Sequence, residues 1–186
     1  MPNPKDPKHA AAARAAGGAD VAAVGQAASG AEAIVLAVPW PAVQDAIAAC
    51  GNLAGRIVID VTNPLRMDAD GLELALGFDR SGAEFIAGLA QGAAVFKALN
   101  QVGFEVMSDS MGFPARPVMF VAGDDARAKA VVMGLVSDLG FQALDTGGLK
   151  IARLLEPYAM LWIHQVVDCG APRDSAFAFM ARRGSL

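Results

Sequence analysis

The sequence predicts an α/β domain in which a mostly parallel sheet is covered by helices on both faces. Short runs rich in Val, Ile and Phe alternate with segments that carry helix-start signals, as strand–helix repeats do. The runs are apolar at nearly every position rather than at every second one, which is typical of strands buried on both faces. With 186 residues, 54% hydrophobic and 6% aromatic, the chain is expected to form one compact domain with a core of small side chains.

Four apolar runs are the expected strands. Those at 33–39, 56–61 and 94–99 are expected to lie side by side in that order, because consecutive strands joined by helices usually neighbour one another. A fourth run occupies 117–122. The segment 66–79 carries three Asp and one Glu without the spacing of a calcium loop, so we expect a solvated loop there.

Helix boundaries are indicated between these strands. Pro41 stands where a first helical turn tolerates proline, ahead of the sequence AVQDAIAAC. Ser81 and Glu84 have the spacing of a capping box. The two Asp at 124–125 open a further helix, for which Gly140 is the expected stop.

The C-terminal part, 149–186, differs from the alternating unit at 1–148. Leucines and aromatic residues recur there at helical spacing although Pro157 interrupts the pattern, so we expect a kinked or broken helix that caps the sheet. Its apolar stripe can cover this chain's own sheet or bury itself against a second copy. We favour a homodimer, in which Leu154, Tyr158 and Trp162 face the partner.

Composition excludes several classes of protein. The formal net charge of −4 leaves no basic patch for a phosphate backbone, so we expect no nucleic-acid partner. Charged residues interrupt every apolar stretch long enough to span a membrane, and the N-terminus lacks the apolar region of a signal peptide. We therefore expect a cytoplasmic protein without a membrane partner.

The cysteines and the histidine near the C-terminus do not indicate a metal site. Cys50 and Cys169 lie far apart and form no CxxC motif, so both are expected to be reduced, packed thiols. His164 lies on the apolar C-terminal stripe, and we expect a buried or interface side chain with its hydrogen bonds satisfied.

Strand-breaking residues follow three of the expected strands and are the candidate site. An open parallel sheet binds ligands beyond the carboxyl ends of its strands, and short amide or hydroxyl groups there suit an amide or a ribose. The other interpretation is turn chemistry, since Asn and Pro are common in turns. The candidates are Val38, Pro39, Trp40, Thr62, Asn63, Ala98, Leu99 and Asn100.

The dinucleotide fingerprint G-x-G-x-x-G is absent, because no two glycines in the chain are separated by a single residue. The sequence opens with MPNPKDPKH and continues into an alanine-rich stretch that is predicted to be helical. We therefore expect that a strand–helix–strand unit of about 30 to 35 residues, including the glycine loop, precedes this sequence in its relatives.

Five segments together resemble the NADP oxidoreductases that use the deazaflavin coenzyme F420, and their dinucleotide-binding reductase relatives. The resemblance is specific because the motifs AVPWPAV, VTNPL and KALN occur together in this order, whereas any one of them alone is weak evidence for the family. The resemblance covers nearly the whole chain. The segments are EAIVLAVPWPAVQDAI, GRIVIDVTNPL, VFKALNQVG, RPVMFVAGDDARAKAVV and ARLLEPYAMLWI.

The resemblance implies a Rossmann-type fold and a hydride transfer between NADP(H) and a deazaflavin or flavin acceptor. Relatives that are ferric reductases pass electrons to a haem-linked chain instead. Residues 1–148 are then a partial NAD(P)-binding domain and 149–186 a dimerisation segment. Because such an enzyme orients two rings, no acid–base catalytic residue is expected.

The resemblance also assigns roles to residues. Val38 and Pro39 would line the nicotinamide and deazaflavin site, Thr62 and Asn63 would bound the ribose side, and residues 98–100 would close the pocket. Trp40 is expected mainly to pack. Lys97 can attract a cofactor phosphate, although a lysine at a strand end more often extends to solvent.

Two questions stay open at this point. Pro2 and Asn3 stand where relatives often place an arginine for the 2′-phosphate of NADP, so NAD is a possible cofactor. The alternative to an oxidoreductase is a non-catalytic remnant that keeps the sheet and acts as an oligomeric or partner-binding module.

Overall fold

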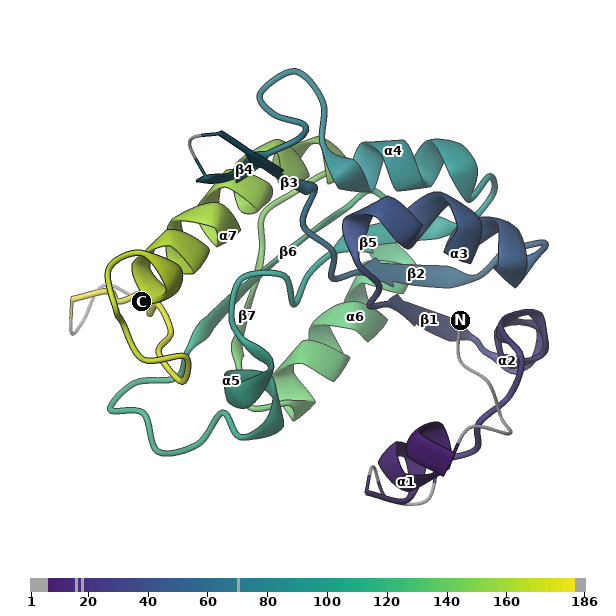
Figure 1. Ribbon diagram of the computed structural model, residues 1–186, viewed down its shortest axis with the longest axis horizontal. Coiled ribbons are helices and arrows are strands. Elements are labelled where there is room, and N and C mark those ends of the chain that lie inside the picture. The colour runs from purple at the N-terminus through teal and green to yellow at the C-terminus, as the bar shows by residue number, and fades with distance from the viewer. Residues whose placement is uncertain (1–6, 16, 18, 70, 183–186) are drawn as a thin grey trace.

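The computed structural model describes residues 7–182 except 16, 18 and 70, and it confirms the α/β fold (Figure 1). In this part of the chain, five strands form one sheet in the order β1-β2-β5-β6-β7. The three expected neighbours, β1, β2 and β5, pair in parallel. The strands are β1 Ala33–Leu36, β2 Ile57–Asp60, β5 Ala94–Lys97, β6 Val118–Gly123 and β7 Gln142–Asp145.

Helices cover both faces of the sheet. Residues that alternate along β2 and β5 point to opposite sides: Val58 and Val95 join one core cluster, and Ile59 and Phe96 join the other. The helices are α1 Pro7–Ala15, α2 Val24–Gly30, α3 Val43–Cys50, α4 Gly82–Leu89, α5 Phe104–Ser108, α6 Ala126–Asp138 and α7 Ala152–Val167, with short 3-10 helices η1 Trp40–Ala42 and η2 Leu149–Ile151.

The expected helix signals act as predicted. The Ser81 hydroxyl accepts the Glu84 amide while the Glu84 carboxylate accepts the Ser81 amide, so the capping box is formed. Asp125 caps α6 by accepting the amide of Ala128 at 2.8 Å. Each cap satisfies backbone donors that the first turn of a helix leaves unpaired.

β6 runs antiparallel to β5, which makes the sheet mostly rather than wholly parallel. Gly123 faces Phe96 in this pairing, and a Cβ placed on Gly123 would lie 2.1 Å from the Phe96 ring. The close approach of the two strands therefore requires glycine at this position.

The segment expected to be a solvated loop is a hairpin. β3 (Leu65–Asp68) pairs with β4 (Gly71–Leu74) in an antiparallel sheet of its own. Arg66 and Glu73 face each other in this register and form an ion pair. The sequence pattern did not indicate these two strands, because a two-stranded hairpin that packs on one side lacks the continuous apolar runs of the central strands.

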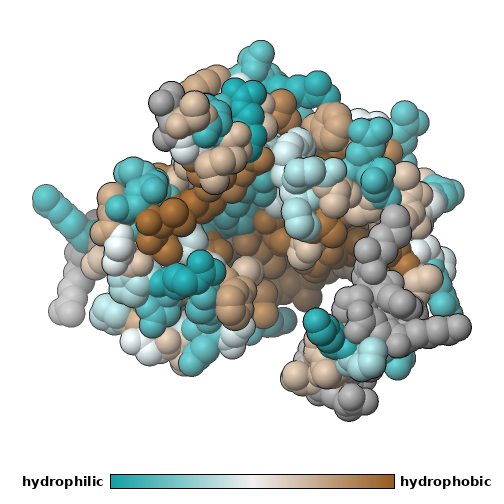
Figure 2. Space-filling view, in the orientation of Figure 1, coloured by the Kyte–Doolittle hydropathy of each residue, from teal (hydrophilic) through white to brown (hydrophobic). Residues whose placement is uncertain are grey.

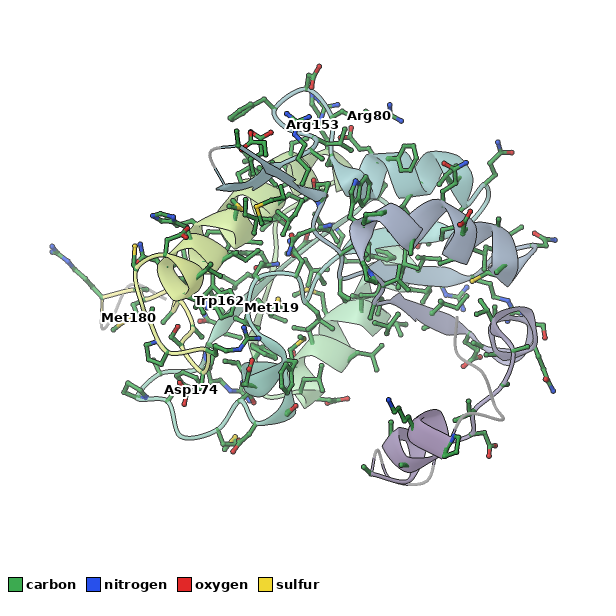
Figure 3. The ribbon with its side chains drawn as sticks, viewed as in Figure 1. Arg80, Met119, Arg153, Trp162, Asp174 and Met180 are labelled. Carbon is green, nitrogen blue, oxygen red and sulfur yellow. The ribbon has the colours of Figure 1, made fainter. Side chains whose placement is uncertain are left out.

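α7 continues through Pro157, so the expectation of a helix broken at this residue is wrong. Two of the side chains that we assigned to a partner surface are covered by this chain itself. Tyr158 packs edge-on against Phe120 and contacts Phe177. The Trp162 ring, labelled in Figure 3, is buried and its Nε1 donates to the carbonyl of Ser175 at 2.9 Å.

Leu154 alone of the three is exposed, at 64% of its surface. The partner-facing assignment of Tyr158 and Trp162 is therefore wrong, because the segment that follows α7 folds back over them. Among the residues that the structure describes, no helix combines the length and the apolar character that a bilayer crossing requires.

Gly123→Ala is predicted to lower the free energy of unfolding by about 1–3 kcal/mol, because the new methyl group must displace Phe96 from a close-packed core. Gly134→Ala is the control: it lies inside α6 with open space around it, so better helix propensity should raise stability by up to about 1 kcal/mol. Urea denaturation of both variants measures the effect. Equal stability of the two variants would contradict the close approach of β5 and β6.

Candidate functional site

The turns that follow β1, β2 and β5 meet at the carboxyl edge of the sheet. The side-chain amide of Asn63 donates to the backbone carbonyl of Asn100 at 3.0 Å. The side-chain amide of Asn100 donates back to the side-chain oxygen of Asn63 at 3.0 Å. The backbone amide of Val61 donates to the carbonyl of Leu36, which ties the first turn to the second. The structure therefore brings together the three groups of candidate residues.

The first group forms an apolar wall. Val38 is half-buried and Pro39 is exposed at the start of η1. The Trp40 ring packs edge-on against Phe85, with 5.7 Å between centroids, and lies so close to Gly82 that a Cβ there would be 3.0 Å from the ring. Trp40 is thus held by α4, as expected of a packing residue.

The second and third groups are mostly covered by protein. Thr62, Ala98, Leu99 and Asn100 are buried, whereas Asn63 is half-exposed. Leu99 adopts a left-handed backbone with φ 62°, which costs a non-glycine residue about 1 kcal/mol or more and is found most often near functional sites. Its strain lies at the turn that carries Asn100.

The Lys97 side chain does not extend to solvent and is not free to bind a phosphate, so both interpretations of this lysine are wrong. It is fully buried, and its Nζ lies 2.8 Å from Asp60 Oδ2 and 3.0 Å from Glu156 Oε1. It also donates to the carbonyl of Thr62 at 2.5 Å. Burial of a lysine requires such partners, because an unpaired charge in the interior is very costly.

The two carboxylates around Lys97 each hold a neighbouring turn. Asp60 Oδ1 accepts the backbone amide of Thr62 at 2.8 Å and its hydroxyl at 2.7 Å. Glu156 Oε2 accepts the amide of Gly82 at 2.9 Å, and Oε1 accepts that of Ala83 at 3.2 Å. The cluster of Asp60, Lys97 and Glu156 therefore fixes the turn after β2 and the first turn of α4, whose N-terminal dipole favours the extra negative charge.

A side-chain amide next to Asn100 completes this polar layer. Gln101, which is buried, donates to the Asn100 side-chain oxygen at 3.1 Å and to the Phe120 carbonyl at 2.9 Å. Its own oxygen accepts the Phe120 amide at 3.0 Å. Sequence reasoning missed Gln101, Asp60 and Glu156, although a carboxylate inside the apolar runs RIVID and LLEPYAM was a visible signal.

Glu84 links α4 to α7 at the same end of the molecule. Arg153 binds its carboxylate with both Nε at 2.8 Å and Nη2 at 2.7 Å. The pKa of Glu84 is lowered from 4.5 to about 2, mainly by the hydrogen bonds from Arg153 and further by those from Ser81. The pair helps to hold Glu156 over the start of α4.

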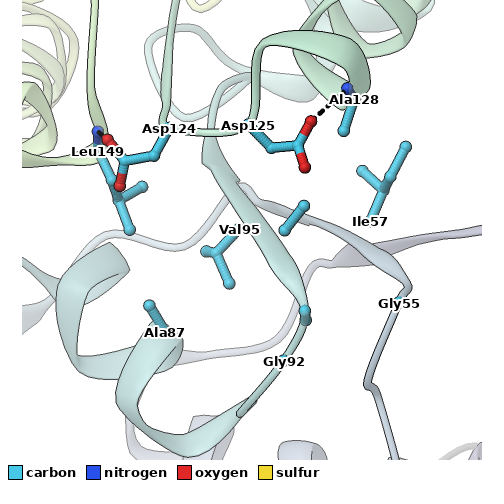
Figure 4. Close-up of a pocket in the computed structure, with 11 residues that line it drawn as sticks. Gly55, Ile57, Ala87, Gly92, Val95, Asp124, Asp125, Ala128 and Leu149 are labelled. Carbon is cyan, nitrogen blue, oxygen red and sulfur yellow. Dashed lines mark hydrogen bonds between the residues drawn. The ribbon is translucent and has the colours of Figure 1, made fainter.

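A cavity of about 360 Å³ lies away from this edge, at the amino ends of β2 and β5 (Figure 4). Gly55 and Gly92 line it, together with Asp124 and Asp125 at the start of α6. The two aspartates already accept the amides of Leu149 and Ala128. Their negative charge makes this cavity unsuited to an anionic dinucleotide.

The face that contains the carboxyl edge is instead hollowed in its centre. Figure 2 shows that apolar surface forms the floor of this hollow, between α7 and the side of the sheet that carries β1 and α3. Pro2 and Asn3, the expected neighbours of the 2′-phosphate, lie outside the described residues. The described residues contain no group of three or more His, Cys, Asp or Glu placed to hold a metal ion.

Lys97→Met is predicted to lower the free energy of unfolding by about 3–5 kcal/mol, because it leaves two buried carboxylates without a counter-charge. Lys129→Met is the matched control. It breaks a lysine–aspartate pair whose Asp145 side chain is 53% exposed, and it should cost no more than about 1 kcal/mol. Denaturant titration compares the two, and equal losses would show that burial does not govern the strength of the cluster.

Glu84→Gln tests the link between α4 and α7 through pH. A carboxyl whose pKa is about 2 in the folded protein and near 4.5 when unfolded stabilises the fold above the higher value and loses this effect as pH falls to the lower. The variant should therefore be less stable by about 1–2 kcal/mol at neutral pH. The difference should shrink between pH 4.5 and 2. A difference that is constant with pH would exclude the Arg153 interaction as its cause.

Comparison with known proteins identifies relatives of the whole fold. A family model described as NADP oxidoreductase, coenzyme F420-dependent, matches residues 2–64. A hypothetical protein from Sinorhizobium meliloti is 26% identical with a TM-score of 0.68, over 78% of this chain and 71% of that one. An NADPH complex of a reductive aminase from Aspergillus terreus, at 16% identity and a TM-score of 0.58 over 87% of this chain and 50% of that one, shares the fold alone.

Metalloreductase STEAP3 from Rattus norvegicus is 32% identical over 105 residues, which are 56% of this chain. The chain spans only about a fifth of the length of that relative, since 20% of it is covered.

The structure of a candidate F420-dependent NADP-reductase from Arthrobacter sp. FB24 extends the likeness over most of both proteins. Its TM-score is 0.80 with 30% sequence identity, and the match covers 92% of this chain and 79% of that one. The Rossmann-type fold is thereby confirmed. Identity at this level over most of a protein shows that the chain belongs to the family of coenzyme F420-dependent NADP oxidoreductases.

Proposed function

We propose that this chain acts in an NADP-dependent oxidoreductase that transfers a hydride between NADP(H) and a deazaflavin or flavin acceptor. The observation that carries the proposal is the joining of the turns after β2 and β5 by the reciprocal amide pair of Asn63 and Asn100, with the end of β1 tied to them by the Val61 amide. The carboxyl edge of a parallel sheet is where this fold binds its ligands. Family membership supports NADP as the hydride carrier.

The described residues fit the nicotinamide half of the cofactor. Val38 is half-buried and Pro39 is exposed, and together they offer an apolar surface against which a ring can lie with water excluded. Asn63 is half-exposed and has one amide hydrogen beyond the bond to Asn100, so it can bind a ribose hydroxyl or a carboxamide. Thr62, Ala98, Leu99 and Asn100 support this surface from beneath.

The pyrophosphate half is not matched in the same way. In this fold, a glycine-rich loop and the start of a helix bind the phosphates through backbone amides, and this sequence contains no G-x-G-x-x-G. The Lys97 ammonium is enclosed by Asp60, Glu156 and the Thr62 carbonyl, so it is not available to bind a phosphate.

NADP(H) supplies the hydride when bound, and the chain's residues orient it. The cluster of Asp60, Lys97 and Glu156 positions the Thr62 and Asn63 turn through the Asp60 oxygens. Fixing the donor ring relative to an acceptor ring reduces the entropy cost of bringing two molecules together. No acid or base is assigned, because hydride transfer between two such rings needs orientation above all.

A homodimer through α7 also remains a proposal. Leu154 and Leu161, seven residues apart on one helix face, are 64% and 51% exposed and can bury each other in a symmetric pair. Within the described part of the chain β1 is an edge strand and Val35 is 55% exposed, so β1 offers a second surface for association.

The test is a titration of NADPH and NADH into this chain and into the same chain extended by an N-terminal strand and glycine loop, followed by cofactor fluorescence. We predict weak binding to the first and much tighter binding to the second, because backbone amides at a helix start provide most of the pyrophosphate affinity. Low-micromolar affinity of the unextended chain, about −8 kcal/mol, would contradict this account.

Asn63→Ala in the extended chain should weaken NADPH binding and slow reduction of F420 or a flavin, whereas Gln44→Ala on the exposed side of α3 should change neither. If neither form binds NADP(H), the partner-binding alternative is favoured.

A further inference from the structure

Three polar side chains form a relay at the end of α7, outside the candidate site. His164 Nδ1 lies 2.7 Å from Asp168 Oδ2, and His164 Nε2 lies 3.5 Å from Cys169 Sγ. The His164 side chain is 52% exposed, so it is not buried within this chain, and an interface position for it stays a prediction. Cys169 is exposed, so the expectation that its thiol is packed is wrong.

The backbone fixes the geometry of this relay. The amides of Asp168 and Cys169 both donate to the carbonyl of His164, at 2.9 and 3.2 Å. Gly170 follows with φ 74°, a left-handed conformation that lets the chain turn back at the helix end. The amide of Ala171 then donates to the carbonyl of Gln165 at 2.9 Å. Cys169 is therefore held beside His164 rather than placed there by a free loop.

The chain after the turn anchors the helix end as well. Trp162, two residues before His164, is buried and bonded to the Ser175 carbonyl. In Figure 3, Trp162 lies against the segment that carries Asp174 and Met180. The relay thus lies at a helix end that is anchored to the following segment, while its own side chains stay open to solvent.

The three groups are arranged as those of an activated thiol. The Asp168 carboxylate accepts a hydrogen bond only from a protonated Nδ1, which leaves the Nε2 lone pair facing the thiol. Nε2 can then take the proton of Cys169, and the imidazolium stays paired with Asp168. The thiolate is the reactive form of cysteine. Asp168 acts as a positioning residue in this arrangement.

Cys50 provides an internal contrast. It is buried in the core beside α2 and α3, and burial raises its pKa. The Cys50 thiol is therefore neither accessible to a disulfide nor activated for attack.

We propose that Cys169 is a reactive thiol that exchanges with small-molecule disulfides. The Cys169 thiolate attacks one sulfur of the disulfide, a new S–S bond forms to Cys169, and the second sulfur leaves as a thiolate. The thiol proton passes to His164 and from there to solvent or the leaving group. One S–S bond breaks and one forms, so no further oxidant is needed: the Cys169 sulfur is oxidised from the thiol to the disulfide level, and the leaving sulfur is reduced from the disulfide to the thiol level.

This site is independent of the proposed nicotinamide site. Glu156 and Asp168 are separated by about 18 Å along the axis of α7 at 1.5 Å per residue. Loss of the thiol chemistry therefore leaves NADPH binding unchanged, and the two proposals fail separately.

The experiment measures the rate at which the whole chain releases coloured thiolate from dithiobis(nitrobenzoic acid) at neutral pH, with the modified residue identified by mass spectrometry. We expect one fast phase at Cys169, absent from Cys169→Ala, and a slow phase at Cys50. His164→Gln should slow the fast phase on the order of tenfold, as loss of a positioned base does at an exposed site. Gln165→Ala, a neighbour on the same exposed helix end, should leave it unchanged.

Asp168→Asn tests the positioning role. It should slow the fast phase and shift the His164 ring away from the Nδ1–H tautomer, which NMR of the imidazole nitrogens detects. A fast phase that His164→Gln leaves unchanged would overturn the proposal, as would modification of Cys50 at the same rate as Cys169.

Discussion

The buried ion cluster of Asp60, Lys97 and Glu156 is the interaction on which the rest of the site depends. It joins the ends of two central strands to α7, a helix that follows them far along the chain. Every oxygen of its two carboxylates has a partner: the lysine, two backbone amides of α4, or the backbone and hydroxyl of Thr62. A cluster of this kind adds little net stability over an apolar core, but it allows only one arrangement of the turns around it.

That restriction explains how the strained backbone of Leu99 at the carboxyl edge is maintained. Leu99 holds a left-handed backbone between two fixed points, Lys97 in the cluster and Asn100 in the amide layer with Asn63 and Gln101. Because the side chains of Lys97 and Asn100 are both held by their partners, Leu99 between them is kept in its left-handed conformation. In the proposed site, the surface that meets the ligand is therefore small and consists of Val38, Pro39 and the side of Asn63 that is not bonded to Asn100.

The fold could be predicted from sequence because its signals are local. Each apolar run indicates its own strand, and the Ser81–Glu84 capping box and the Asp125 cap each mark the start of a helix. The order of β1, β2 and β5 follows from the way helices connect them. β7 and the hairpin of β3 and β4 were missed, because their side chains are only partly buried and their patterns are correspondingly weak. The role of Lys97 was missed for a different reason. Its partners lie on distant elements, and only the folded structure shows that a charged residue in a strand is paired rather than exposed.

We propose that the turns joined by Asn63 and Asn100 form the nicotinamide-binding surface. An amide NMR spectrum recorded during titration with reduced nicotinamide mononucleotide tests this directly, because the ligand lacks the adenylate half. We expect the signals that move to belong to residues near Val38, Asn63 and Asn100, while those of Gly55 and Gly92 at the opposite cavity stay in place. Shifts confined to the cavity of Gly55, Gly92 and Asp125, or no shifts at millimolar ligand, would contradict it.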